Sequence, residues 1–299
     1  MTFNPLIIGA IQSSGAGAQI ITYSTTGSPT SNDHTYSGTK YRSLYWTGSG
    51  TFTVVGNPLQ QEIKVLLGAG GGGGSGDYTA GGGGGGGCRE LAIAGSTAAQ
   101  VWTITLGAGG SAGLTGAPNY NSAGDGVNST FVGASAGTLV ACTGGGHGGR
   151  YPNYYAGAGG AGGGGSSFYG DPGGAGNSGG YSPVEGYAGN AGVWGVGFYP
   201  DTGGGGGGSG QAGLSGFGSP SNMWGGAGGY AVTTVIRTGA SENAFGGGGG
   251  GGGYNQNFPR GATGASLYYG NGGVAGAAGG YSGGAGWAGA CVVRFPYEW

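Results

Sequence analysis

Residues 61–87 read QEIKVLLGAGGGGGSGDYTAGGGGGGG, an apolar run that passes directly into two runs of glycine. The apolar part, with its isoleucine, valine and leucines, is typical of a short β-strand. The glycines that follow have no side chain to bury, and ordering them costs more backbone entropy than ordering any other residue. The fold of the whole chain therefore depends on how ordinary strands and bare glycine backbone are combined.

Glycine makes up 90 of the 299 residues, whereas an average protein contains about 7% glycine. Ordering a residue costs about 1–2 kcal/mol of backbone entropy, so the glycines oppose folding by on the order of 100 kcal/mol. A chain stays disordered when low hydrophobicity is combined with high net charge, but here 36% of the residues are hydrophobic, 11% are aromatic and the net charge is −2. We therefore expect ordered glycine runs; the alternative is a set of flexible linkers.

Short segments rich in Val, Ile, Thr and aromatic residues, each bounded by Gly, Asn, Pro or Ser, predict β-strands. They lie at residues 43–55, 61–70, 88–95, 100–109, 129–132, 138–142, 230–238 and 289–296. In the first of them Phe52 and Val54 alternate with Thr51, Thr53 and Val55, so the two sets are expected on opposite faces of a sheet. No segment has apolar residues at helical spacing. The sequence predicts an all-β fold with almost no helix.

The longest glycine runs are residues 70–74, 81–87, 203–208 and 246–253. They follow no strict Gly-X-Y register and the chain has only 11 prolines, which excludes collagen. A polyproline-II backbone has three residues per turn, and its N–H and C=O groups point outward. Neighbouring glycine segments can therefore hydrogen-bond to one another and satisfy their backbone groups between segments. We expect the glycine runs to form such a polyglycine-II bundle.

These patterns divide the chain into four parts. The predicted parts are an N-terminal attachment arm (1–40), sandwich strands with the first glycine-rich inserts (41–142), glycine-rich inserts with aromatic loops and one strand near 230–238 (143–286), and a closing strand (287–299).

Aromatic clusters punctuate the glycine-rich part, and turn-forming Pro, Asn and Asp accompany most of them. Tyr and Trp provide rigid contact area at low entropic cost, and aromatic faces suit sugars and other half-apolar surfaces. The candidate receptor-binding residues are Trp194, Phe198, Tyr199, Trp224, Tyr254, Phe258, Tyr268 and Tyr269. The alternative is that these side chains cover the sides of the bundle itself.

The charge balance and the hydropathy exclude several classes of partner. With 8 Lys and Arg against 10 Asp and Glu, the chain offers no basic surface for nucleic acid. No stretch approaches the roughly 20 apolar residues of a membrane helix. The first residues have neither a basic start nor a small-residue cleavage site, so we expect no secretory signal and no membrane insertion.

Candidate catalytic and metal-binding residues are few. Cys88, Cys142 and Cys291 each lie in an apolar β-like run, so we expect buried thiols rather than a disulfide framework or a zinc site. His147 follows Cys142 closely, and a Cys–His pair is the minimum for thiol catalysis; yet no Asn or Asp to orient the imidazole is evident, and an exposed histidine is expected. Asp125 is interpreted as a turn residue, with weak Ca²⁺ binding as the alternative.

Two further chemistries lack support. The Gly-x-Gly-x-x-Gly matches, for example from Gly157, have no helix after them, so they do not predict a dinucleotide site. The carboxylates that could form a glycosidase pair are far apart in the sequence, and depolymerase activity is not expected; they are Asp171, Glu185, Asp201 and Glu242. We expect no catalytic residue, metal or cofactor, and not an enzyme.

The order of motifs resembles the glycine-rich proteins and domains of tailed-phage tail fibres and prophages. The motifs are WTGSGTFTVV (46–55), EIKVLLGAGGGGG (62–74), TITLGAGG (103–110) and the ending GGAGWAGACVVRFPYEW (283–299). The ending that many of those proteins share is carried here by Gly283, Gly284, Gly286, Gly289, Val292, Val293, Arg294, Phe295 and Pro296. The resemblance covers about residues 41–299.

The glycine runs are also similar to the distal adhesins of some T-even-type phages, which implies polyglycine-II bundles with receptor-binding loops. The β-segments at both ends of the chain resemble the glycine-rich modules of certain animal receptor kinases, which implies a jelly-roll-like β-sandwich with polyglycine inserts. The resemblance to the phage proteins implies a virion protein of the tail fibre or tail tip that binds a host receptor. The receptor is expected to be a surface glycan or an outer-membrane protein. The expected partners are other fibre or tail subunits, with the chain either a homotrimer or a cap on a trimeric fibre, assembled in the host cytoplasm. The alternative is a purely structural virion decoration or extracellular filament subunit without a receptor.

Overall fold

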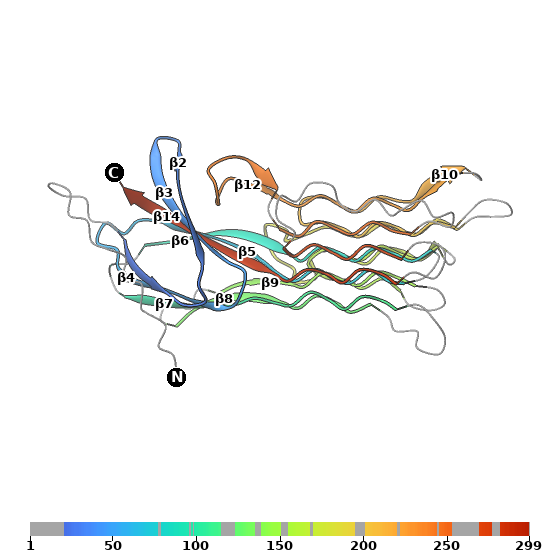
Figure 1. Ribbon diagram of the computed structural model, residues 1–299, viewed down its shortest axis with the longest axis horizontal. Coiled ribbons are helices and arrows are strands. Elements are labelled where there is room, and N and C mark those ends of the chain that lie inside the picture. The colour runs from blue at the N-terminus through green and yellow to red at the C-terminus, as the bar shows by residue number, and fades with distance from the viewer. Residues whose placement is uncertain are drawn as a thin grey trace.

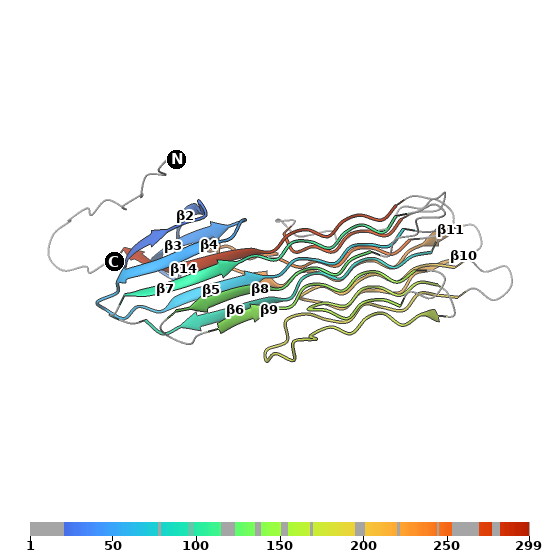
Figure 2. The same ribbon diagram turned by 90° about the horizontal axis from the view of Figure 1, so that it is seen from below.

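The computed structural model describes residues 21–76, 79–95, 97, 99–114, 123–134, 139–150, 155–167, 170–194, 201–219, 222–243, 245–252, 269–276 and 282–298. These residues form an elongated molecule with two parts (Figure 1). A sandwich of two β-sheets occupies one end, and a bundle of extended glycine segments continues its strands toward the other end (Figure 2).

The sandwich contains two five-stranded antiparallel sheets. In the first the order is β1 (Thr22–Thr25), β4 (Gly50–Gly56), β7 (Gln100–Thr105), β8 (Ser129–Gly133) and β9 (Leu139–Cys142). In the second it is β2 (Thr30–Tyr36), β3 (Thr39–Trp46), β14 (Ala290–Glu298), β5 (Ile63–Gly68) and β6 (Cys88–Ile93). Two short ribbons pair β10 (Phe217–Ser219) with β11 (Asn222–Trp224), and β12 (Thr233–Thr234) with β13 (Glu242–Asn243). The described residues include no helix, which confirms the all-β prediction.

Aromatic side chains from both sheets form the core of the sandwich. Phe52 of β4 stacks on Trp102 of β7 at a ring-centroid distance of 5.7 Å, and on Phe295 of β14 at 5.8 Å. Burial of a side chain such as Phe stabilises a fold by about 1.5–3 kcal/mol. Phe52 and Val54 are buried whereas Val55 is 58% exposed, so the predicted alternation along β4 is confirmed.

The sandwich begins earlier in the chain than the sequence predicted. β1 and β2 lie within residues 1–40, which were expected to form an attachment arm, and β2 pairs with β3 along its whole length. The sequence of β2, TSNDHTY, has no apolar alternation because it is an exposed edge strand. Residues 1–20 lie outside the described residues.

The segment 230–238 was predicted as a strand, but only Thr233–Thr234 forms one. The chain turns back after it, with Gly239 at a φ of +76°, a conformation that favours glycine. Ile236, within the turn, is fully buried against the outer face of the second sheet. Residues 232–243 therefore form a cap on the sandwich, called the cap below.

Segment 79–87, which leads into β6, lies at the centre of the glycine bundle. Its N–H groups point in three directions in turn: Gly84 donates to the carbonyl of Gly146 (2.7 Å), Gly85 to Gly207 (2.9 Å) and Gly86 to Gly270 (2.7 Å). One turn earlier the same three neighbours are reached by Gly81, Gly82 and Gly83, which donate to Gly149, Gly204 and Gly273. A repeat of three residues with no hydrogen bond within the segment is the polyproline-II geometry.

Six segments surround the central one: 69–76, 143–150, 161–167, 201–208, 246–252 and 271–276. Each either accepts hydrogen bonds from the N–H groups of segment 79–87 or donates to its carbonyls. Adjacent members of this ring also bond to each other, as Gly145 does to Gly70 and Gly204 to Gly165. The described glycine segments are therefore a hydrogen-bonded polyglycine-II bundle, not a set of flexible linkers.

The close approach of the segments explains why glycine is required at the centre. A Cβ atom added to Gly83 would lie 2.2 Å from the carbonyl oxygen of Gly72, and one added to Gly84 would lie 2.2 Å from that of Ala161. Such distances are well inside van der Waals contact, so any side chain would force the segments apart. Each hydrogen bond contributes a net stabilisation of about 0.5–1.5 kcal/mol, which offsets part of the backbone entropy lost when these glycines become ordered.

Candidate functional site

The end of the bundle opposite the sandwich, called the free end below, carries the β10–β11 ribbon (Figure 1). In this ribbon Phe217 pairs with Trp224. At the same end of the bundle an isolated bridge joins Val193, the residue before Trp194, to Thr202. The ribbon and the bridge therefore place Trp224 and Trp194 at the same end of the molecule.

Near the free end, buried polar side chains form hydrogen bonds that join the segments to one another. Ser167 Oγ donates to Thr79 Oγ1 (2.7 Å), and Ser75 Oγ donates to the carbonyl of Gly148 (2.6 Å). The N–H of Ser166 donates to Asp171 Oδ2 (3.1 Å). Burial raises the pKa of Asp171, and the hydrogen bonds from Ser166 oppose that rise only in part. These contacts satisfy polar groups where the regular glycine network ends, and so hold the ends of the segments in place.

Three of the eight candidate receptor-binding residues lie among the described residues. Trp194 is 41% exposed and Trp224 is half-buried, and both are at the free end. Tyr269 lies instead where the bundle meets the sandwich. Its ring packs edge-on against Tyr45 at 5.7 Å, beside the buried cluster that contains Phe245. The structure therefore does not bring Tyr269 together with the two tryptophans.

The other five candidates fall outside the described residues: Phe198, Tyr199, Tyr254, Phe258 and Tyr268. Exposed aromatic side chains that the prediction did not include lie on the outer segments of the bundle, namely Tyr155, Tyr187, Tyr230 and Trp287. Receptor binding by the eight candidates therefore stays a prediction. Some are presented at the free end, and others lie on the sides of the bundle.

His147 was expected to be an exposed histidine without an orienting carboxylate, and this was wrong. Its Nδ1 lies 2.6 Å from Asp125 Oδ1, and its backbone N–H donates to the same oxygen at 2.8 Å. The two residues are 22 positions apart but sit on neighbouring segments, since Gly126 donates to the carbonyl of Gly145. Asp125 is therefore not a turn residue but the partner of His147.

The hydrogen-bond partners of His147 favour the charged imidazolium over the neutral ring. Nδ1 faces the Asp125 carboxylate and Nε2 faces the carbonyl oxygen of Tyr155 at 3.2 Å, and both of these groups are acceptors. The hydrogen bond to Asp125 raises the pKa of His147, with burial opposing the rise. Burial alone would raise the pKa of Asp125, but the hydrogen bonds and charge of His147 together lower it.

Cys142 and His147 do not form a catalytic pair. Cys142 ends β9, is buried in the sandwich core, and directs its thiol to the carbonyl of Leu67 at 3.1 Å. Burial raises the pKa of this thiol well above its ordinary value, so the reactive thiolate is suppressed. The side chain of His147 meanwhile is engaged with Asp125, on the bundle.

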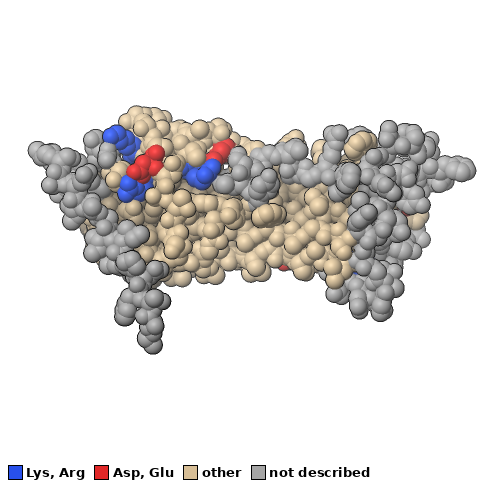
Figure 3. Space-filling model, viewed as in Figure 1, with Lys and Arg blue, Asp and Glu red and all other residues tan. Residues whose placement is uncertain are grey.

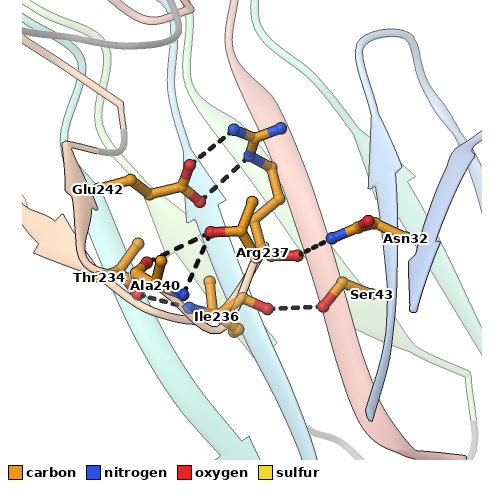
Figure 4. A network of polar contacts seen from close by, with 8 residues as sticks. Asn32, Ser43, Thr234, Ile236, Arg237, Ala240 and Glu242 are labelled. Carbon is orange, nitrogen blue, oxygen red and sulfur yellow. Dashed lines mark hydrogen bonds and ion pairs between the residues drawn. The ribbon is translucent and has the colours of Figure 1, made fainter. Parts of the chain in front are cut away.

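The outer face of the second sheet is occupied by the cap (Figure 4). Ser43 Oγ donates to the carbonyl of Ile236 (2.6 Å), and Asn32 Nδ2 donates to that of Arg237 (3.0 Å). Arg237 is itself held by an ion pair with Glu242 at 2.6 Å. Because these contacts bury Ile236 against β3, β5 and β14, this part of the sheet is not available to a ligand.

Charged side chains gather mainly over the sandwich and the cap, while the visible side of the bundle is largely uncharged (Figure 3). One charged pair on the sandwich is Arg42 with Asp33, at 2.6 Å. Within the described ranges, no three His, Cys, Asp or Glu residues are grouped as metal ligands would be. Nor does the described part of the chain contain a helix that is long and apolar enough to cross a membrane.

A two-sheet sandwich whose strands continue into a polyglycine-II bundle defines the class of protein. The chain belongs to the glycine-rich domain family, whose family model matches residues 46–296. This range runs from the last residue of β3 into β14, so it includes the bundle and most strands of the sandwich but not β1 or β2. No curated protein matches the chain.

Proposed function

We propose that this protein is a phage virion component of the tail fibre or tail tip that binds a receptor on the host cell surface. The observation that carries the proposal is the position of Trp194 and Trp224 at the free end of a rod, away from the sandwich. Binding residues are commonly found on loops that a rigid scaffold positions. The sandwich end is then the end that attaches to other fibre or tail subunits.

The rigidity of the bundle favours a binding role for its free end. Ordering loops on association costs free energy, and a scaffold that already holds the base of the loops reduces that cost. Here the Ser167–Thr79 and Ser75–Gly148 hydrogen bonds fix the segments near the free end. Each tryptophan can therefore present its ring with little loss of conformational entropy.

The proposed receptor is a surface glycan or an outer-membrane protein. Aromatic rings pack well against the apolar faces of sugars and against half-apolar protein surfaces. Several copies on one particle, as a homotrimer or as caps on trimeric fibres, would add avidity to a weak single contact. The proposal places the protein on the virion and includes neither nucleic-acid binding nor membrane insertion.

Adsorption of particles to host cells tests the proposal. The double variant Trp194→Ala/Trp224→Ala is expected to lower the adsorption rate constant by at least about tenfold, because aromatic anchors at binding sites are worth about 2 kcal/mol or more. Trp287→Ala is the matched control, since Trp287 is also an exposed tryptophan but lies on a segment that leads into β14. Unchanged adsorption of the double variant, with folding intact by circular dichroism, would contradict a receptor site that uses these tryptophans.

A purely structural role is the second candidate. It is favoured by the exposed Tyr155, Tyr187 and Tyr230 on the sides of the bundle, which neighbouring subunits would cover in an assembly. Electron microscopy of particles labelled on this chain separates the two roles. A position at the tip of a fibre agrees with the adhesin, and a lattice position on a shell agrees with the structural role.

A further inference from the structure

The cap covers a histidine of the edge strand β2. Strand alternation places His34 on the outer face of the second sheet together with Asn32, which bonds to the cap. The His34 ring packs on the backbone of the cap, since a Cβ atom added to Gly239 would lie 2.7 Å from its Cδ2. Both ring nitrogens are shielded from solvent, and neither has a hydrogen-bond partner among the described residues. A neutral imidazole has one N–H group, so His34 already holds an unsatisfied donor here, and a proton would add a second.

A buried cation lies beside this histidine. Arg294 of β14 is buried under the same cap, where its Nη1 donates to the carbonyl of Val235 at 3.4 Å. The rings of His34 and Tyr41 stack at a centroid distance of 6.1 Å, and the guanidinium of Arg294 lies 4.6 Å from the centroid of the same Tyr41 ring. Within the part of the chain that the structure describes, Arg294 forms no ion pair. A charged His34 would therefore lie next to a buried cation that has no carboxylate partner.

The acidic side chains around the cap are already engaged in ion pairs. These pairs are Asp33–Arg42 (2.6 Å), Glu242–Arg237 (2.6 Å) and Glu90–Lys64 (3.7 Å). Asp33 moreover lies on the opposite face of β2 from His34, because the two residues are adjacent in a strand. Burial and the charge of Arg294 lower the pKa of His34, and the backbone of Asn32 and the charges of Asp33 and Glu242 oppose this only in part. The uncharged ring is therefore the form that the closed cap accommodates.

We propose that acid releases the cap: a proton on His34 detaches residues 232–243 from the outer face of the second sheet. Like charges that are brought together in a buried site repel strongly, and the new N–H group has no acceptor there. Detachment lets water reach both cations. The contacts that oppose it include the hydrogen bonds of Ser43 and Asn32 to the cap (Figure 4). Release also uncovers Leu66 and Val292, the apolar side chains of the sheet that Ile236 covers in the closed state.

The direction of the pH dependence follows from the two states of the cap. With the cap detached, His34 is in water and titrates near its ordinary pKa of 6.5, and with the cap closed its pKa is lower. The detached state therefore binds the proton more tightly. The closed cap has its full stability above pH 6.5, becomes less stable as the pH falls below that value, and the loss is complete below the closed-state pKa. The chain has one other histidine, His147, whose pKa is raised instead, so the two respond over different pH ranges.

Hydrogen exchange of the full chain, followed by mass spectrometry on peptides from the cap, tests the proposal. The samples are compared at about pH 7.5 and about pH 5, a range that brackets the ordinary pKa of histidine. After correction for the intrinsic effect of pH on exchange, protection of the cap is expected to fall at least about tenfold at the lower pH. Protection of β7 in the first sheet is the internal reference and should not change, since its strand lies away from the cap. A wild-type cap whose protection is the same at both pH values would overturn the proposal.

Two variants assign the effect to this histidine. His34→Phe keeps a ring against Tyr41, His34→Gln keeps a polar side chain, and neither can gain a proton, so the cap of each variant should keep its protection in acid. The matched control is His147→Asn, which removes the other histidine and should lose cap protection as the wild type does. If acid lowers cap protection in the His34 variants as much as in the wild type, His34 does not release the cap. Host adsorption does not enter these measurements, so their result is separate from that of the proposed receptor site.

Discussion

Asp125 Oδ1 accepts two hydrogen bonds from His147, one from the ring Nδ1 at 2.6 Å and one from the backbone N–H at 2.8 Å. Because His147 also reaches the carbonyl of Tyr155, the pair fastens three segments of the bundle side by side. Most hydrogen bonds between segments of the bundle join backbone groups, whereas this one joins two side chains. A variant that removes this pair should therefore change the free energy of unfolding while the backbone hydrogen bonds of the bundle stay the same.

The first prediction concerns pH. The hydrogen bond to Asp125 raises the pKa of His147 above its ordinary value of 6.5. The contribution of His147 to the free energy of unfolding is therefore full below pH 6.5 and is lost as the pH rises through the folded-state pKa. The pKa of Asp125 is lowered below 3.8, so its contribution is full above pH 3.8 and is lost as the pH falls through the lowered value. The pair therefore stabilises most in mildly acidic solution.

Denaturant unfolding at a series of pH values checks this expectation. Since Asp125 is half-exposed, the free energy of unfolding of the wild type should exceed that of His147→Asn by about 0.2–1 kcal/mol near pH 6, and the difference should shrink in alkaline solution. The variant Asp125→Asn should behave in the same way. A difference that is constant with pH would show that the imidazolium does not contribute.

The second prediction concerns the centre of the bundle. Gly84→Ala places a methyl group 2.2 Å from the carbonyl oxygen of Ala161, a contact that only separation of the segments can relieve. Overpacking of this kind costs about 1–3 kcal/mol, and we expect the upper part of this range because the neighbours are backbone atoms. Gly48→Ala is the control, since nothing lies within 4 Å of its added Cβ. Equal midpoints of urea unfolding for the two variants would contradict the close packing of the bundle.

The third prediction concerns the buried carboxylate of Glu185, at the junction of bundle and sandwich. Its Oε2 accepts the N–H of Thr143 at 2.7 Å and its Oε1 accepts that of Gly179 at 3.3 Å. Glu185→Ala leaves two N–H groups without this acceptor, each at a cost of about 1–3 kcal/mol, so a loss of about 2 kcal/mol or more is expected. Glu185→Gln keeps one carbonyl oxygen and should lose less. If both variants unfold at the same denaturant concentration, the carboxylate does not act through these bonds.

The fourth prediction concerns thiol reactivity. Burial raises the pKa of Cys88 to about 12, and burial likewise raises the pKa values of Cys142 and Cys291. The native protein should therefore not react with a thiol-specific reagent at neutral pH, because the reactive thiolate is absent and access is blocked. After unfolding in guanidinium chloride all three thiols should react. Reaction of any of them in the native state would contradict the packing around it.

The strands that the sequence predicted have a clear apolar pattern. β4 was located because its apolar residues alternate, and β14 because its apolar run is continuous, which fits a middle strand that is buried on both faces. β2 was missed because an exposed edge strand such as TSNDHTY needs no such pattern. The ordering of the glycine runs followed from composition and backbone chemistry. The sequence did not predict which glycine runs are neighbours in the bundle, because bare backbone offers the same donor and acceptor at every residue.

For the candidate site, too, the sequence did not predict which segments are neighbours. The aromatic clusters predicted turns between the glycine segments. Trp194 and Trp224 lie at one end of the bundle, the free end. Tyr269 has the same kind of sequence neighbours but packs on Tyr45, because segment 271–276 starts from the sandwich end. The pairing of His147 with Asp125 likewise depends on which segments are adjacent. Linear spacing carries no signal for either contact.

The ring of segments around segment 79–87 also determines when the bundle can fold during synthesis. Gly86 finds its acceptor at Gly270, and the middle strand of the second sheet, β14, starts only at Ala290. Contacts this distant in sequence close slowly and late. The central segment therefore cannot complete its ring of hydrogen bonds until residues 270–276 have been synthesised, and a chain cut short before them leaves the N–H groups of Gly83 and Gly86 without their acceptors.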